Sequence, residues 1–149
     1  MRITVISVGK IKEKYLKDAI DSYSSQIRKN HELEFIQIPD EKAPENLSEA
    51  LMMRVKAKEG LGILRYVKDD MYVITLEIEW VLLTSEKFVK RIHQARNMNK
   101  NHLCFIIGGS LGLDQQVSKR SDFKLSFSKM TFPHQLMQVI LLDQLAQNL

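Results

Sequence analysis

The chain has 149 residues, of which 44% are hydrophobic and 27% charged, a composition typical of one folded domain and not of a disordered chain. One cysteine and four scattered histidines exclude a disulfide framework and a tetrahedral zinc pattern, so we expect no metal and a reducing, cytoplasmic location. No apolar run approaches the ~20 residues that span a bilayer, and we expect no targeting segment before the first strand. The excess of 22 Lys and Arg over 18 Asp and Glu gives a positive net charge, which permits a polyanionic partner without establishing one.

The first half of the chain alternates between strand and helix patterns. β-branched residues dominate the first apolar run, and apolar residues then recur at helical spacing. The pattern predicts, in order, a strand over 2–8 that stops at Gly9, a helix over 14–29, a strand over 33–38 ended by Pro39, a loop over 40–46, and a helix capped by Ser48 and carrying Leu51, Met52, Val55 and Leu64.

The second half continues the alternation. The run 103–107 is uninterrupted apolar sequence, as expected for a central parallel strand covered on both faces. The other predicted elements are a strand over 71–78, a helix capped by Thr84 or Ser85 and ending in 97–101, a short strand near 124–127, and a last helix from Pro133.

Strands that alternate with helices predict an open α/β fold with a parallel sheet, in one domain over residues 1–149. The last helix is apolar nearly all round, so it must be buried on several sides. In a domain of this size that favours a two-fold homodimer, the alternative being a helix packed only within its own chain.

Lysines gather at two places. Lys10, Lys12, Lys14 and Lys17 follow the first strand, and a second basic group, Lys119, Arg120, Lys124 and Lys129, precedes the last helix. Such groups are able to neutralise RNA phosphates, while an ordinary solvated surface is the simpler interpretation.

Ligands of open α/β sheets collect at the carboxyl ends of the strands, here near Leu76, Gly108 and Phe127. Gly108 and Gly109 permit close approach of a ligand to the backbone, or simply make a tight turn. The stretch has neither the dinucleotide fingerprint nor a P-loop, which argues against NAD and ATP.

The other candidate catalytic groups are explained more simply by structural roles. Cys104 lies inside an apolar strand, where a thiolate is unfavourable. Glu77 and Glu79 alternate along a strand end, as on a solvated edge, and His134 is most simply a capping or packing residue.

Four stretches together resemble one known family. They are ITVISVGKIKEKY, VITLEI, FIIGGSLGL and LSFSKMTFPHQLM, and they are similar to the family of ribosomal RNA large subunit methyltransferase H, a small member of the SPOUT class of S-adenosylmethionine-dependent RNA methyltransferases. The resemblance covers nearly the whole chain. It implies an α/β fold with a C-terminal trefoil knot, a homodimer, and methylation of N3 of a pseudouridine in large-subunit ribosomal RNA, free or in the assembled ribosome.

The resemblance also implies a pocket for S-adenosylmethionine but no catalytic residue. Carried over motif by motif, the pocket consists of Leu76, Gly108, Phe127, Ser128, Lys129, Met130, Thr131 and Phe132. Backbone groups and apolar side chains would bind the nucleoside without a charged side chain. The absence of phosphate-binding motifs agrees with this, because S-adenosylmethionine carries no phosphate.

The chain departs from the family pattern at a few positions. Family members typically have Gly at the position of Trp80, Arg at Gln138, a Tyr-Arg pair at Ala146 and Gln147, and about ten further residues. These departures leave an alternative open: a paralogue that keeps fold, dimer and cofactor pocket as a binding protein but is impaired in turnover. A nucleotide-binding α/β domain of other function is a third, weaker hypothesis.

Overall fold

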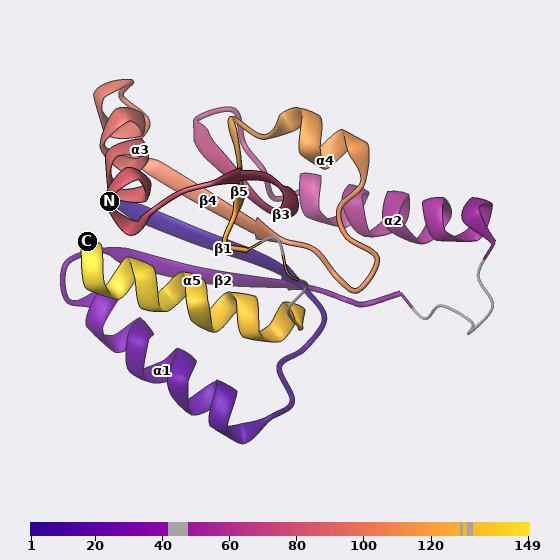
Figure 1. The fold of residues 1–149 in the computed structure, drawn as a ribbon, viewed down its shortest axis with the longest axis horizontal. Coiled ribbons are helices and arrows are strands. Elements are labelled where there is room, and N and C mark those ends of the chain that lie inside the picture. The colour runs from indigo at the N-terminus through magenta and orange to yellow at the C-terminus, as the bar shows by residue number, and fades with distance from the viewer. Residues whose placement is uncertain (42–47, 129, 131–132) are drawn as a thin grey trace.

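Strands from both halves of the chain form one parallel sheet in the computed structural model (Figure 1). The structure describes residues 1–41, 48–128, 130 and 133–149, leaving aside the side chains of 78–81 and 134. Within these residues the sheet has five strands in the order β2-β1-β4-β3-β5. They are β1 (Arg2–Val8), β2 (Glu32–Ile38), β3 (Met71–Leu82), β4 (His102–Ile107) and β5 (Phe123–Ser126). The predicted α/β class with a parallel sheet is confirmed.

Helices cover both faces of the sheet. One face packs against α1 (Lys14–Arg28), α3 (Ser85–Asn97) and α5 (His134–Asn148), and the other against α2 (Glu49–Leu64) and α4 (Gln115–Arg120) (Figure 1). All six residues of β4 are buried, as expected for a strand with helices on each side. Burial on both faces explains why that strand reads as unbroken apolar sequence.

Local sequence signals predicted the N-termini of two helices, α2 and α3. The Ser48 hydroxyl accepts from the Leu51 N–H at 3.2 Å, which confirms that predicted N-cap, and the Thr84 hydroxyl accepts from the Lys87 N–H at 3.2 Å, so that of the two candidates Thr84 and Ser85 the first is the N-cap. The short helix α4 was not predicted, because its six residues include only one buried side chain, Val117.

The third strand is longer than predicted. It was expected over 71–78, but it continues to Leu82. The pairing of β3 with β5 shifts between Leu76 and Val81, and Val81 and Leu82 then pair with Leu125 and Ser126. Across this irregularity the end of β3 pairs with β5 again, which lets the strand continue to Leu82.

The last helix is buried from several directions within this chain. Leu141, Leu142 and Leu145 are each 0% exposed in the larger core, which also contains Ile20 and Ile27 of α1. Figure 1 shows α5 lying alongside α1. Packing inside the chain therefore accounts for much of the apolar character of α5, and the homodimer stays a prediction.

Two further expectations concern the chain path and the membrane. The expected trefoil knot concerns the segment after β5, of which residues 129, 131 and 132 lie outside those described, so the knot stays a prediction. No described helix is long and apolar enough to cross a membrane.

Candidate functional site

Three strand ends converge at the carboxyl edge of the sheet. Leu76 of β3 pairs with Ile107 of β4 on one side and with Leu125 of β5 on the other. Gly108 follows Ile107 directly, and Phe127 comes two residues after Leu125. The structure thus brings Leu76, Gly108 and Phe127 to one place, although they lie far apart in the sequence.

The glycines after β4 form a tight turn. The Gly112 N–H donates to the Gly109 carbonyl at 3.1 Å, and Gly112 has a φ of +86°, which side chains rarely tolerate. A Cβ on Gly108 would lie 3.0 Å from the Gly112 carbonyl carbon and 3.0 Å from Leu113 Cδ2. The glycine at 108 is therefore required by the turn itself, whatever binds beside it.

The segment after β5 bends back at once. The Ser126 hydroxyl donates to the Ser128 carbonyl at 2.8 Å, and the Met130 N–H donates to the Ser128 hydroxyl at 2.9 Å. The Phe127 ring packs edge-on against Phe88 with centroids 6.5 Å apart, while Met130 is 72% exposed. The bend therefore holds one aromatic ring inward and leaves one flexible apolar side chain at the surface.

The described residues of the predicted pocket carry no charge. Of the predicted pocket residues, Leu76, Gly108, Phe127, Ser128 and Met130 are described, and none of them has an ionisable side chain. Lys129, Thr131 and Phe132 lie outside the described residues. Apolar side chains beside backbone groups are able to cover a heterocycle and hydrogen-bond its edge, which fits an uncharged nucleoside better than a phosphate.

A buried carboxyl group lies behind the glycine turn. Glu59 of α2 is only 5% exposed, and its Oε2 accepts from the Glu41 N–H at 3.2 Å. A Cβ on Gly109 would lie 3.5 Å from Glu59 Oε1 and 3.1 Å from Val8 Cγ1. Burial, with the Asp40 carboxyl group as neighbour, raises the pKa of Glu59 to about 7.

Sequence reasoning missed Glu59, yet a signal was present. It lies four residues after Val55 and four before Ile63, so it shares their helical face. A carboxyl group on an apolar face is expected to have a partner or a shifted pKa.

The expectation of a solvated edge at Glu77 was wrong. Its carboxylate is partly buried and accepts from the Ser118 hydroxyl at 2.7 Å and from the Thr75 hydroxyl at 2.8 Å. Glu77 therefore ties α4 to β3. The side chains of Glu79, Trp80 and His134 lie outside the described part of the chain.

The other residues at which the chain departs from the family pattern lie on α5. Gln138 is 4% exposed, and the Gln147 side-chain amide donates to both carboxylate oxygens of Asp143 at 3.0 Å. The Gln138 side chain is buried in the packing of the helix, the Gln147 side chain lies exposed on its surface, and within the described residues neither amide hydrogen-bonds to a predicted pocket residue.

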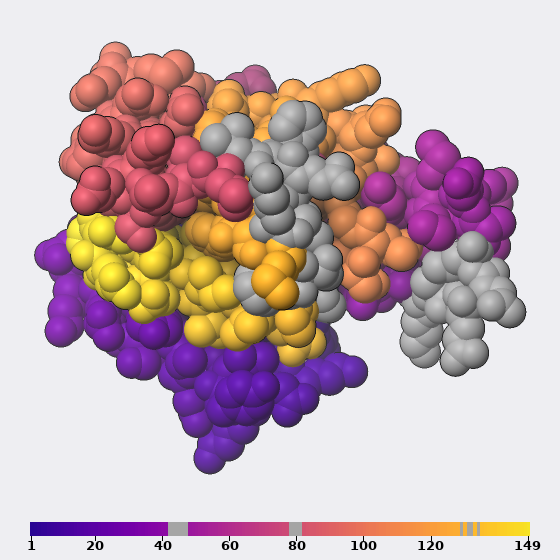
Figure 2. Space-filling model, in the orientation of Figure 1, coloured from indigo at the N-terminus to yellow at the C-terminus, as the bar shows by residue number. Residues whose placement is uncertain are grey.

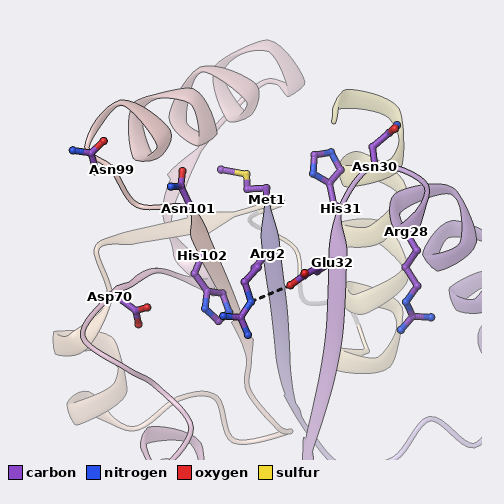
Figure 3. A pocket seen from close by; sticks show the side chains of 10 residues that line it. All are labelled: Met1, Arg2, Arg28, Asn30, His31, Glu32, Asp70, Asn99, Asn101 and His102. Atoms are coloured by element: carbon purple, nitrogen blue, oxygen red, sulfur yellow. Dashed lines mark ion pairs between the residues drawn. The ribbon is translucent and has the colours of Figure 1, made fainter.

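A polar cavity of about 700 Å³ opens at the opposite edge, beside the amino ends of β1, β2 and β4 (Figure 3). Arg2 pairs with Glu32 at 3.1 Å there, and His102 shares a 2.7 Å hydrogen bond with Thr4. Burial lowers the pKa of His102, so the imidazole is neutral near pH 7. None of the predicted pocket residues lines this cavity. Over the described residues no group of three or more His, Cys, Asp or Glu is placed to hold a metal ion.

Comparison with known proteins gives consistent matches over nearly the full length. Residues 1–147 match the sequence pattern of a family described as "Predicted SPOUT methyltransferase". The chain is 55% identical to ribosomal RNA large subunit methyltransferase H 1 of Clostridium perfringens over 144 residues, 97% of this chain and 91% of that protein. It is 53% identical to ribosomal RNA large subunit methyltransferase H of Alkaliphilus oremlandii over 149 residues, 100% of this chain and 94% of that protein. It is also 54% identical to a putative ribosomal RNA large subunit methyltransferase H of Methanococcus maripaludis over 145 residues, 97% of this chain and 91% of that protein.

Proposed function

We propose, because the chain belongs to the SPOUT methyltransferase family, that it methylates large-subunit ribosomal RNA, with S-adenosylmethionine as donor and N3 of a pseudouridine as acceptor. The observation that carries this proposal is the similarity over nearly the whole chain to proteins named for that RNA. The donor and the acceptor atom rest on the resemblance of FIIGGSLGL and LSFSKMTFPHQLM to the family motifs.

The carboxyl edge is the proposed donor site. Leu76 and Phe127 would cover the adenine with apolar surface, while the backbone at Gly108, Ser128 and Met130 would offer hydrogen-bonding groups to its edge. Lys129, Thr131 and Phe132 complete the set by resemblance. S-adenosylmethionine supplies an activated methyl group, so the main task of these residues is to hold donor and acceptor close and in line.

The acceptor atom, unlike the donor, must be activated before the methyl transfer. An imide N3–H must lose its proton before the nitrogen becomes a good nucleophile, so a basic group or a positive charge near the developing anion favours the reaction. We assign no residue to this role. The lysines of this basic chain are the available positive charges, and RNA is the partner that their excess suits.

We also propose that the protein works as a cytoplasmic homodimer. Leu136, Met137, Val139 and Ile140 of α5 remain only partly buried beside the fully buried leucines of that helix. A second copy would cover them by a two-fold contact. Analytical ultracentrifugation at micromolar concentration is expected to give about twice the chain mass, and a monomer would contradict the proposal.

A binding protein that is impaired in turnover is the second candidate. The departures at Trp80, Gln138 and Gln147 favour it, since the last two offer amides where the family has cations. Restoring arginine at both positions is expected to raise turnover strongly only if this candidate is correct, because an already active protein gains little.

Methyl transfer is the direct test. Protein, radiolabelled S-adenosylmethionine and unmethylated large-subunit RNA, free or as ribosomes, are expected to give label in the RNA at one uridine-derived position. Calorimetry with S-adenosylmethionine and its demethylated product measures the pocket separately. Donor binding without transfer supports the second candidate, and neither binding nor transfer by folded protein would refute both.

A further inference from the structure

The surface that follows β1 has the chemistry of a nucleic-acid contact. Lys10, Lys12, Lys14 and Lys17 are exposed, and Tyr15 between them is 70% exposed. We call these five residues the lysine–tyrosine patch. Within the described residues, none of the four ammonium groups makes an ion pair or a hydrogen bond. Four lysines against the carboxylates of Glu13 and Asp18 leave the patch positive.

The lysines of the patch lie near the N-terminus of α1, where a helix favours negative charge. The first turn of α1 has no acidic residue, and Glu13 at the N-cap makes no side-chain capping hydrogen bond. The N-terminus of a helix carries partial positive charge, so lysine at positions 14 and 17 is unfavourable there. Residues that oppose local stability are a mark of functional sites.

Core packing and a backbone hydrogen bond anchor the connection between the patch and the strand end beside the proposed donor site. Ile11 packs against the larger core, and the Gly9 N–H donates to the Ile38 carbonyl at 2.9 Å. Val8, two residues before Lys10, contacts the glycine turn after β4, where a Cβ on Gly109 would lie 3.1 Å from Val8 Cγ1. Figure 1 shows the connection running from the carboxyl end of β1 to the first turn of α1, and Figure 2 shows α1 at the rim of the molecule.

We propose that the lysine–tyrosine patch binds the RNA substrate beside the methylation site, with the four lysines on phosphates and the Tyr15 ring stacked on an unpaired base. The inference rests on the proposed function, because it takes the carboxyl edge as the reacting edge. A phenol ring among lysines suits RNA with unpaired bases, since every base offers a face for stacking, whereas an anionic lipid surface would use the lysines alone.

The salt dependence of RNA binding tests the lysines. The triple variant K10Q/K12Q/K14Q is compared with K29Q/K68Q/K100Q, which removes the same charge at the opposite, amino edge of the sheet. Binding of large-subunit RNA is measured by filter retention from 50 to 300 mM KCl. The slope of log affinity against log salt is expected to become shallower by about 2 in the patch variant, and to stay near the wild-type slope in the control. Equal changes in both variants would overturn the proposal.

Tyr15 is tested at fixed salt. Tyr15→Ala is expected to weaken RNA binding by about fivefold or more, while Tyr15→Phe, which keeps the ring, and Tyr66→Ala, which removes another exposed tyrosine, leave it unchanged. Full affinity in Tyr15→Ala would overturn the stacking contact. Loss of binding to vesicles of anionic lipid in the patch variant, with RNA binding intact, would overturn the choice of partner.

The two proposals fail separately. Wild-type protein that transfers no label from S-adenosylmethionine to RNA refutes the proposed function. Wild-type protein that methylates RNA, while the patch variant binds that RNA with an unchanged salt slope, refutes the patch alone. Circular dichroism and thermal unfolding of each variant show that the fold is retained.

Discussion

Replacing Glu59 by glutamine is expected to change how the stability of the protein depends on pH. Glutamine keeps the size of the side chain and an oxygen that accepts from the Glu41 N–H, but it cannot ionise. The wild-type carboxyl group is buried beside Asp40, and its pKa rises from 4.5 to about 7 in the folded protein.

The sign follows from proton binding. Between pH 4.5 and 7 the folded protein holds a proton on Glu59 that the unfolded chain has released, so the free energy of unfolding falls as pH rises through this window. At ~1.36 kcal/mol per pKa unit the loss totals about 3 kcal/mol. Above pH 7 the Glu59→Gln variant avoids this loss and has a higher free energy of unfolding than the wild type, while near pH 4.5 the variant and the wild type differ little.

Urea unfolding followed by circular dichroism from pH 5 to 8.5, at one protein concentration, measures the effect. Subtracting the wild-type curve from that of Glu59→Gln removes the titration of other groups, including His31 and His102. Glu49→Gln, at an exposed position in the first turn of the same helix, is the matched control and is expected to follow the wild type. Parallel curves for Glu59→Gln and the wild type would refute the assignment of a shifted pKa to this group.

Three further predictions concern the same half of the molecule. Gly108→Ala is expected to weaken S-adenosylmethionine binding at least tenfold by calorimetry, because its Cβ would press on the turn backbone at 3.0 Å. The control Gly62→Ala, whose Cβ meets only the Ile38 side chain at 3.1 Å, is expected to leave binding unchanged, and equal affinities of the two variants would contradict the prediction. Ser118→Ala removes a donor from the partly buried Glu77 carboxylate and is expected to lower the free energy of unfolding by about 1–3 kcal/mol in urea, a neutral effect counting against it. Burial raises the pKa of Cys104 to about 12, so iodoacetamide at pH 8 is expected to modify it only as fast as the protein opens; rapid labelling of native protein, seen by mass spectrometry, would disagree.

Sequence reasoning succeeded where the cause of a structure is local. The N-caps at Ser48 and Thr84 need only a hydroxyl three residues before an unpaired N–H, and both were predicted, the second with Ser85 as the alternative. The central strand was predicted over 103–107, one residue short of its observed start at His102, because burial on both faces leaves that run without polar positions. Such signals lie within a few neighbouring residues.

It failed where the cause is a contact between distant segments. The carboxylate of Glu77 looked solvated because Ser118, its partner, lies 41 residues away on a helix that was not predicted. The extension of β3 to Leu82 depends on a shift of pairing with β5, which no pattern within β3 reveals. The proposed pocket residues rest on family resemblance, since no short motif marks an uncharged nucleoside site, and they stay a prediction.

The amino-edge cavity and the carboxyl edge of the sheet differ in a way that bears on where chemistry takes place. The amino-edge cavity is lined by polar and charged side chains, among them the ion pair of Arg2 with Glu32 and the hydrogen bond of His102 with Thr4, while the buried Nδ1 of His31 has no hydrogen-bond partner among the described residues. The carboxyl edge instead presents backbone and apolar groups at Leu76, Gly108 and Phe127.

The carboxyl edge also joins two properties that an RNA methyltransferase needs in one place. From the glycine turn the contacts run to Val8, then along the chain through Gly9 to Lys10 and the rest of the lysine–tyrosine patch. Apolar side chains would suit the proposed donor, because an adenosine ring gains from apolar cover. A positive surface suits the acceptor strand, because phosphates dominate RNA affinity. Placing the lysine–tyrosine patch a few residues beyond the glycine turn, rather than at the turn itself, would satisfy both requirements.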